Sequence, residues 1–178
     1  MKYFDEIKKA NEWLATKPET FFMGQSVGCP GTALFNTVKD IDPLKRLELP
    51  VFEEQQAGMT LGMALNGTFV VSIFPRWNFL ICAANQLVNH LDKIGPMSNG
   101  DFQPRFLIRT AVGSRRPLDP QHQHKSDFTE GFRLLLDNIE VIRLENPEDV
   151  MPAYEKAYNR TDGKNTIIVE IADYYNEK

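Results

Sequence analysis

The stretch Thr68-Phe69-Val70-Val71-Ser72-Ile73-Phe74 decides the class of fold. It is a nearly unbroken run of β-branched and aromatic residues, which is typical of a strand buried on both faces of a parallel sheet. Segment 53–65 before it predicts a helix, and the Asn66-Gly67 pair is a common helix stop. Segment 77–94 after it predicts a second, longer helix that Gly95-Pro96 ends. The sequence therefore predicts a buried strand with a helix before and after it.

The same alternation continues outward from this strand. Further strands are predicted at 21–23, 46–49, 106–110, 140–144 and 166–171, and further helices over the N-terminal segment and at 32–41, 128–135 and 147–159. This pattern predicts an α/β three-layer sandwich with a mostly parallel sheet and helices on both faces. We expect residues 1–178 to form a single domain. Sites in such sheets form where strands end, so the loops after Met23, Leu49 and Phe74 and the loop 113–125 are the candidates.

Composition excludes several classes of protein. The chain is 42% hydrophobic and 25% charged, as ordinary globular domains are. Its net charge is −4, so the chain lacks the excess of basic residues that is typical of a nucleic-acid-binding protein. No apolar run reaches the ~18 residues of a membrane helix, and the N-terminal residues are charged where a signal peptide is apolar. Cys29 and Cys82 are too few for a disulfide framework. We expect a cytoplasmic protein without a nucleic-acid or membrane partner.

Familiar catalytic motifs are missing from the sequence. It contains no GxxxxGK[ST], GxGxxG, HExxH or GxSxG pattern. Segment 28–31 before a predicted helix could cradle an anion, but a bare turn is the better explanation. His122 and His124 have the spacing of a chelating pair, yet no third histidine or cysteine pair is near, so we predict no metal site. The alternatives are a solvated loop, or one histidine facing a cleft as an acid, a base or an anion-orienting group.

The segment from Pro50 to Gly62 is the most informative for function. It places two carboxylates, Glu53 and Glu54, just after a strand and at the mouth of a helix. Acidic residues in the first turn of a helix interact favourably with the helix dipole. The spacing alone favours this structural explanation of Glu53 and Glu54 over a catalytic one. Gly58 and Gly62 lie one turn apart, which indicates close helix packing, either within the chain or across an interface.

This segment resembles the pyrimidine-binding domain of transketolase-like thiamine diphosphate enzymes. It is most similar to the beta subunit of the first component of pyruvate and branched-chain 2-oxoacid dehydrogenases. In that family a strand ends in a proline, the cofactor-activating glutamate follows three residues later, and an Ala-Gly-x-x-x-Gly helix comes next. Pro50, Glu53, Ala57-Gly58 and Gly62 fit this pattern in register.

Other parts of the chain resemble the same family in the same order. The matching segments are Gly24–Val27, Phe74–Phe79, Asn85–Asn89, Met97–Phe102, Arg109, the loop 121–126 and Asn146–Asp149. There are also departures: Arg76 stands where the family has an aspartate, and Gln25 where it has an acid lining the active-site tunnel. The 178 residues include neither the family's C-terminal domain nor a Gly-Asp-Gly segment that holds magnesium and diphosphate.

The resemblance implies roles for particular residues. Glu53 would hydrogen-bond the ring nitrogen N1′ of the cofactor's aminopyrimidine, and Gln25 would be a further cofactor-binding residue. Phe74 and Trp77 would stack on that ring, although a purely structural role in the core or at a helix start explains them equally. His122 or His124 would orient the substrate or transfer a proton, and the sequence does not choose between them.

The resemblance also implies a partner. The cofactors would be thiamine diphosphate and magnesium, with the diphosphate and metal held mainly by an alpha-type subunit, in a heterotetramer or with a homodimer of this chain. The complex would cleave or transfer a C–C bond next to the carbonyl of a 2-oxo acid or ketose. The sequence does not distinguish oxidative decarboxylation, ketol transfer and carboligation. Two alternatives remain open: a non-catalytic regulatory or binding module with the same fold, and an unrelated flavodoxin-like domain for a small ligand.

Overall fold

A computed structural model describes residues 2–116 and 119–175. Its strands form one six-stranded sheet in the order β2-β1-β3-β4-β6-β5, and every pair of neighbours is parallel. The strands are β1 (Thr20–Gly24), β2 (Arg46–Glu48), β3 (Phe69–Ile73), β4 (Phe106–Val112), β5 (Ile139–Arg143) and β6 (Asn165–Ile171). The predicted α/β class is confirmed, and each strand overlaps a segment that the sequence predicted.

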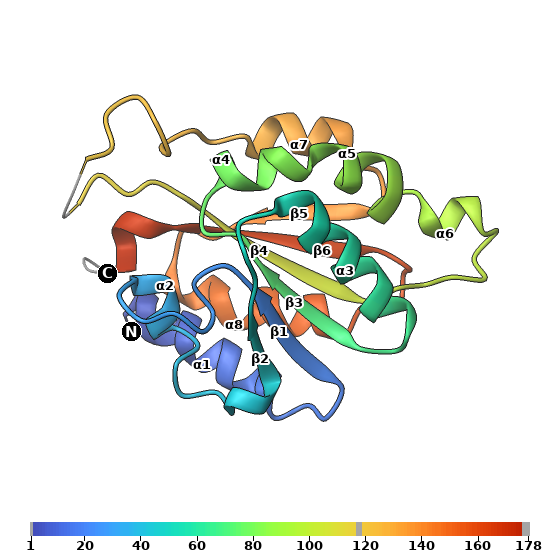
Figure 1. Cartoon of the computed structure of the whole chain (residues 1–178), viewed down its shortest axis with the longest axis horizontal. Helices are drawn as coiled ribbons and strands as arrows, with labels where there is room; N and C mark the ends of the chain where they lie inside the picture. Colours follow the sequence, from blue (N-terminus) through green and yellow to red (C-terminus); the bar gives the residue numbers. More distant parts are fainter. Residues whose placement is uncertain (1, 117–118, 176–178) are drawn as a thin grey trace.

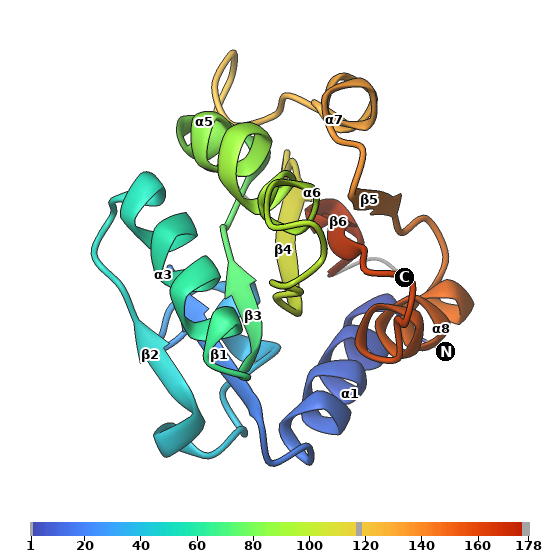
Figure 2. The same ribbon diagram turned by 90° about the vertical axis from the view of Figure 1, so that its right-hand side faces the viewer.

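Helices cover both faces of the sheet (Figures 1 and 2). On one face lie α1 (Tyr3–Ala15), α2 (Ala33–Asn36) and α8 (Pro147–Tyr158); on the other lie α3 (Glu53–Leu65), α4 (Trp77–Leu80), α5 (Ala84–Gln86) and α7 (Thr129–Leu135). All five residues of β3 are buried between these layers, as its nearly continuous apolar sequence predicts. No helix in the described ranges has the length and apolar character to cross a membrane.

The helix predicted at 32–41 is much shorter than expected, since α2 ends at Asn36. Thr32 begins it, because its hydroxyl accepts a hydrogen bond from the Phe35 N–H at 3.0 Å. One turn later the Thr37 hydroxyl donates to the Leu34 carbonyl at 2.7 Å. Such side-chain bonds to the backbone compete with helix continuation, and the chain turns away.

The long helix predicted at 77–94 is also wrong as a single element. The segment divides into α4, η2 (Ile81–Ala83), α5, the π-helical η3 (Leu87–Leu91) and a separate turn, α6 (Ile94–Met97). Because the winding changes along the segment, five side chains that are three, three, four and four residues apart all face the sheet, and all five are buried. These residues are Trp77, Leu80, Ala83, Leu87 and Leu91. Two further short segments among the described residues are η1 (Pro43–Lys45) and η4 (Ala172–Tyr175).

A buried ion pair joins the sheet to the helices on one face. Arg109 on β4 donates from Nε and Nη2 to the Glu170 carboxylate on β6, at 2.7 and 3.0 Å. The hydroxyls of Tyr154 on α8 and Tyr175 in η4 also donate to that carboxylate. Arg109 further donates to side-chain oxygens of Asn11 and Thr37. We call these six residues the buried ion-pair network; it fixes η4 against the carboxyl end of the sheet.

Candidate functional site

Glu53 is the first residue of α3, and it turns inward while Glu54 is exposed. Only 8% of the Glu53 surface is exposed. Its Oε1 accepts a hydrogen bond from Nε2 of Gln25 at 3.1 Å, the one side-chain donor that the described residues give it. A buried carboxylate needs a donor or a cation to offset lost hydration. The Glu53 carboxylate therefore keeps the capacity to accept a further hydrogen bond.

Two polar side chains of α3 fix the helix against β3. Gln56 Nε2 donates to the Ser72 hydroxyl at 3.1 Å and to the Ile73 carbonyl at 2.9 Å. Thr60, one turn further, bonds the same Ser72 hydroxyl at 2.9 Å. These buried bonds set the position of the first turn of α3, and with it the position of Glu53.

Gln25 is set in place by the glycine before it. Gly24 ends β1 with φ +137°, and a Cβ there would lie 2.1 Å from the Ile73 carbonyl oxygen. Only glycine permits this close approach of backbone to backbone. The Gln25 N–H then donates to the same carbonyl at 3.1 Å, and its side chain extends to Glu53.

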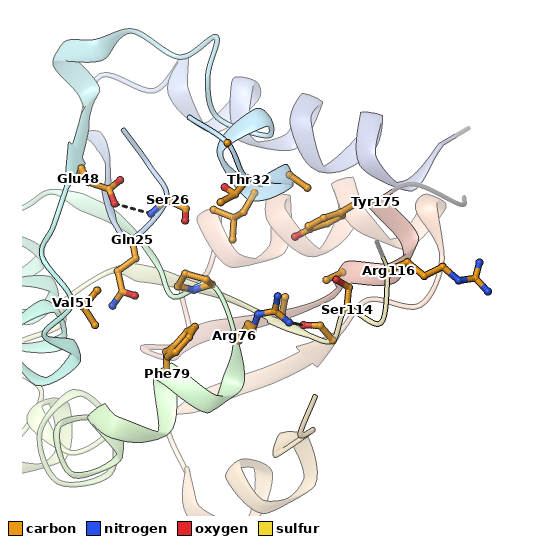
Figure 3. A pocket seen from close by; sticks show the side chains of 17 residues that line it. Gln25, Ser26, Thr32, Glu48, Val51, Arg76, Phe79, Ser114, Arg116 and Tyr175 are labelled. Carbon is orange, nitrogen blue, oxygen red and sulfur yellow. Dashed lines mark hydrogen bonds between the residues drawn. The ribbon is translucent and has the colours of Figure 1, made fainter. Parts of the chain in front are cut away.

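Beside Gln25 a cavity of about 530 Å³ opens at the carboxyl ends of the strands (Figure 3). Its lining comes from the loops after β1, β2, β3 and β4, from the ends of β2 and β4, and from α2, α4 and η4. Glu53 is not among the lining residues, so Gln25 is the link between the buried carboxylate and the cavity. A volume of this size suits a small organic ligand.

The predicted stacking residues lie in the core instead of on this cavity. Phe74 and Trp77 are both 0% exposed, and Trp77 packs on Phe132 with ring centroids 4.8 Å apart. Neither ring presents a free face in the described structure. Two aromatic side chains line the cavity, Phe79 and Tyr175, and the sequence analysis singled out neither. The Tyr175 hydroxyl is already engaged with Glu170. The sequence does contain a signal for Phe79. Buried residues recur at positions 77, 80 and 83, and this spacing places position 79 on another side of the helix.

The two histidines of the loop 113–125 differ in position. His122 is exposed, whereas the ring of His124 lies 5.0 Å from that of Phe79 and is half-buried. Nδ1 of His124 is buried and has no hydrogen-bond partner within the described ranges. The main-chain oxygen of His124 accepts from Nη1 of Arg76 at 3.1 Å. The structure thus brings His124, and not His122, to the aromatic side of the site.

An anion nest does form in this loop, but over residues 26–28 and not over the predicted 28–31, and the chain itself fills it. The Glu48 carboxylate at the end of β2 accepts from the N–H groups of Ser26, Val27 and Gly28 at 2.9, 2.6 and 2.6 Å. Consecutive N–H groups of this kind form a nest for an anion. Glu48 therefore satisfies the nest and shapes the cavity wall.

Gly58 and Gly62 do not serve packing within the described chain. A Cβ at either position would meet no atom within 4 Å, and both residues are exposed. Of the two predictions for this pair, contact inside the chain is wrong, and contact with another molecule stays a prediction.

Taken together, the fold and the site define an α/β domain whose buried glutamate, cavity and aromatic residue gather at the carboxyl edge of a parallel sheet. Comparison with solved structures finds the same fold in a protein described as "Split gene transketolase, inactive beta4 tetramer". The TM-score is 0.70 at 13% identity, over 97% of this chain and 52% of that one.

Sequence comparison identifies relatives named pyruvate dehydrogenase E1 component subunit beta. The protein from Gracilaria tenuistipitata var. liui is 25% identical over 180 residues, which is 98% of this chain and 54% of the relative. The protein from Porphyra purpurea is 25% identical over 81% of this chain and 44% of its own length. A mitochondrial form from Ascaris suum is 31% identical over 48% of this chain and 23% of its own. No family model matches the sequence.

These findings confirm the resemblance to E1 beta subunits and to the transketolase-like fold. The chain spans about half the length, or less, of the curated relatives it matches.

Proposed function

We propose that this chain supplies the aminopyrimidine-binding half of a thiamine diphosphate active site, with Glu53 as the residue that hydrogen-bonds the pyrimidine ring. The complex would act on the carbonyl of a 2-oxo acid or ketose, as the beta subunit of a two-chain enzyme. The observation that carries the proposal is Glu53, a buried carboxylate at the carboxyl edge of the sheet with a single described side-chain donor.

The residues around Glu53 fit a flat nitrogen heterocycle. A carboxylate that can accept another hydrogen bond suits a ring N–H, and Phe79 offers an aromatic face on the adjoining cavity. When bound, thiamine diphosphate supplies a carbon nucleophile and an electron sink for cleavage of a C–C bond next to a carbonyl. The chain's own residues would hold and orient the pyrimidine, and they would exclude water from the Glu53 carboxylate.

His124 is the better of the two histidines for a role near the substrate. Its ring contacts Phe79, and its buried Nδ1 has no described partner, so it is placed to hold or move a proton beside the cavity. His122 is exposed and remains the weaker candidate.

The ligands for magnesium and the hydrogen-bond donors for the diphosphate would come from another chain. The carboxylate of the cavity lining is Glu48, and its charge is already matched by three N–H groups. Metal and diphosphate sites need free oxygen ligands and donors. We therefore propose an alpha-type partner subunit with a diphosphate-binding domain.

The outer side of α3 is the surface proposed for a second copy of this chain. Gly58 and Gly62 leave a shallow strip on it that another helix backbone can approach. Exposed apolar side chains lie at the ends of α3 and in the neighbouring η2: Val51, Phe52, Leu65 and Ile81. The structurally similar split transketolase is described as a β4 tetramer, which agrees with beta–beta contacts of some kind.

The test is exchange of the C2 proton of thiamine diphosphate in a reconstituted pair. This chain would be co-expressed with a diphosphate-domain chain, and hydrogen–deuterium exchange at C2 followed by NMR with magnesium present. We expect exchange with the wild type and loss of about 10²-fold or more with Glu53→Gln, because the neutral amide loses the charged hydrogen bond. Glu54→Gln is the matched control, since that neighbouring carboxylate is exposed.

Equal exchange in wild type and Glu53→Gln would reject the role of Glu53. The alternative of a non-catalytic module rests on Gln25, whose amide already occupies one oxygen of Glu53. That alternative gains if the assembled pair binds the cofactor tightly and yet never exchanges the proton.

A further inference from the structure

Arg76 is the charged residue of the cavity that none of the proposed roles uses. It precedes α4 at the carboxyl end of β3, and its guanidinium lies between Phe79 on one side and Ser114 on the other (Figure 3). Arg116 also belongs to the lining, but its side chain is exposed and points away from the cavity. The positive charge inside the cavity therefore comes from Arg76.

The guanidinium is held by main-chain oxygens and not by a carboxylate. Nη1 of Arg76 donates to the carbonyls of Gly113 and His124. Among the residues that the structure describes, no carboxylate oxygen lies within 4.0 Å of it, although thirteen such ion pairs are formed elsewhere by other residues. Both bonds use Nη1, so the Nε and Nη2 edge is available to a ligand.

The acidic groups around Arg76 are engaged with other partners. Glu48 accepts the three N–H groups of its nest, and Asp173 accepts the Arg115 N–H at 2.8 Å. The Tyr175 hydroxyl donates to Glu170 in the buried ion-pair network. Burial lowers the pKa of Arg76, while Asp173 and Tyr175 act in the opposite direction. A half-buried guanidinium that has lost hydration without gaining a carboxylate is poised for an external anion.

From this geometry we infer that Arg76 binds the anionic group of the substrate, a carboxylate or a phosphate, and so selects for anionic carbonyl compounds. The guanidinium fork matches either group with two parallel hydrogen bonds. Its position beside Phe79 and His124 places the anion next to the proposed reaction site. The inference rests on the proposed function for the identity of the carbonyl compound, but binding of the anion requires neither cofactor nor partner.

The experiment measures ligand binding to the chain alone by two-dimensional ¹H–¹⁵N NMR. The probes are pyruvate, inorganic phosphate and the uncharged hydroxyacetone. We expect saturable shifts at the amides of Phe79 and Ser114 with at least one anion, and at least about tenfold weaker binding in Arg76→Gln. Arg76→Lys should retain part of the affinity, because the charge remains. Arg133→Gln, which removes an arginine that does not line the cavity, should bind as the wild type does.

Comparison of the two anions shows whether the anionic group of the substrate is a carboxylate or a phosphate. Tighter binding of pyruvate supports a 2-oxo acid, and tighter binding of phosphate supports a phosphorylated sugar. The inference is overturned if the wild type binds neither anion saturably, if hydroxyacetone binds as tightly as the anions, or if a folded Arg76→Gln or Arg76→Lys chain binds both anions unchanged. Failure of the proposed function appears separately, as absence of C2 exchange in the reconstituted pair while anion binding to this chain persists.

Discussion

Replacing Glu170 with glutamine should destabilise the protein severely, because it leaves a fully buried cation without its counter-charge. Arg109 is 1% exposed and Glu170 is 1% exposed, and two hydrogen bonds of 2.7 and 3.0 Å join them. Removing one partner of a buried ion pair costs about 3–5 kcal/mol. That is a large part of the ~5–15 kcal/mol that holds an ordinary domain together.

The loss would arise mainly from charge. Glutamine has nearly the same shape as glutamate, and its oxygen can still accept from Tyr154 or Tyr175. Its NH₂ group, however, would face the Arg109 N–H donors. In urea denaturation we expect the unfolding midpoint of Glu170→Gln to fall by at least about 1 M.

The control is an exposed ion pair on the same protein. Glu145 contacts Arg143 at the surface, and Glu145→Gln should change the free energy of unfolding by less than about 1 kcal/mol. The double variant Arg109→Met with Glu170→Met should be clearly more stable than the sum of the two single losses predicts. A loss below about 1 kcal/mol for Glu170→Gln would refute the reasoning.

Three further predictions concern stability and assembly. Burial raises the pKa of Tyr154 and Tyr175 well above the ordinary value, so the folded state keeps protons that the unfolded chain releases above about pH 10. The free energy of unfolding should be unaffected below that pH and should fall above it by up to about 1.4 kcal/mol per pH unit for each tyrosine. Tyr175→Phe should make this fall with pH less steep in urea unfolding experiments, and an unchanged pH dependence in that variant contradicts the assignment. Gly24→Ala should cost more than about 2 kcal/mol in the same assay, because its Cβ would overlap the Ile73 carbonyl, and a near-neutral effect would contradict the close approach. Gly58→Ala and Gly62→Ala should each raise helix stability by up to about 1 kcal/mol but weaken self-association in sedimentation, whereas unchanged association would remove α3 as the interface.

The sequence predicted the layers of this protein well because burial on two faces leaves a local pattern. A strand buried on both faces, such as β3, is apolar at nearly every position, and that pattern is visible without knowing its neighbours. The segment 77–94 was predicted less well, since its winding changes from turn to turn to keep Trp77, Leu80 and Ala83 against the sheet. No propensity of single residues encodes such a change.

The candidate site, too, was predicted only in part from the sequence. The order of residues from Pro50 to Gly62, and its likeness to E1 beta subunits, identified Glu53 as the candidate carboxylate. Only the tertiary structure decided that Gln25 meets this carboxylate and that Phe79 lines the cavity while Trp77 is buried. It also decided that His124 contacts Phe79 while His122 is exposed. The reason is physical: which side of a helix or loop faces a cavity depends on contacts with segments distant in the chain, and a local pattern carries no record of them.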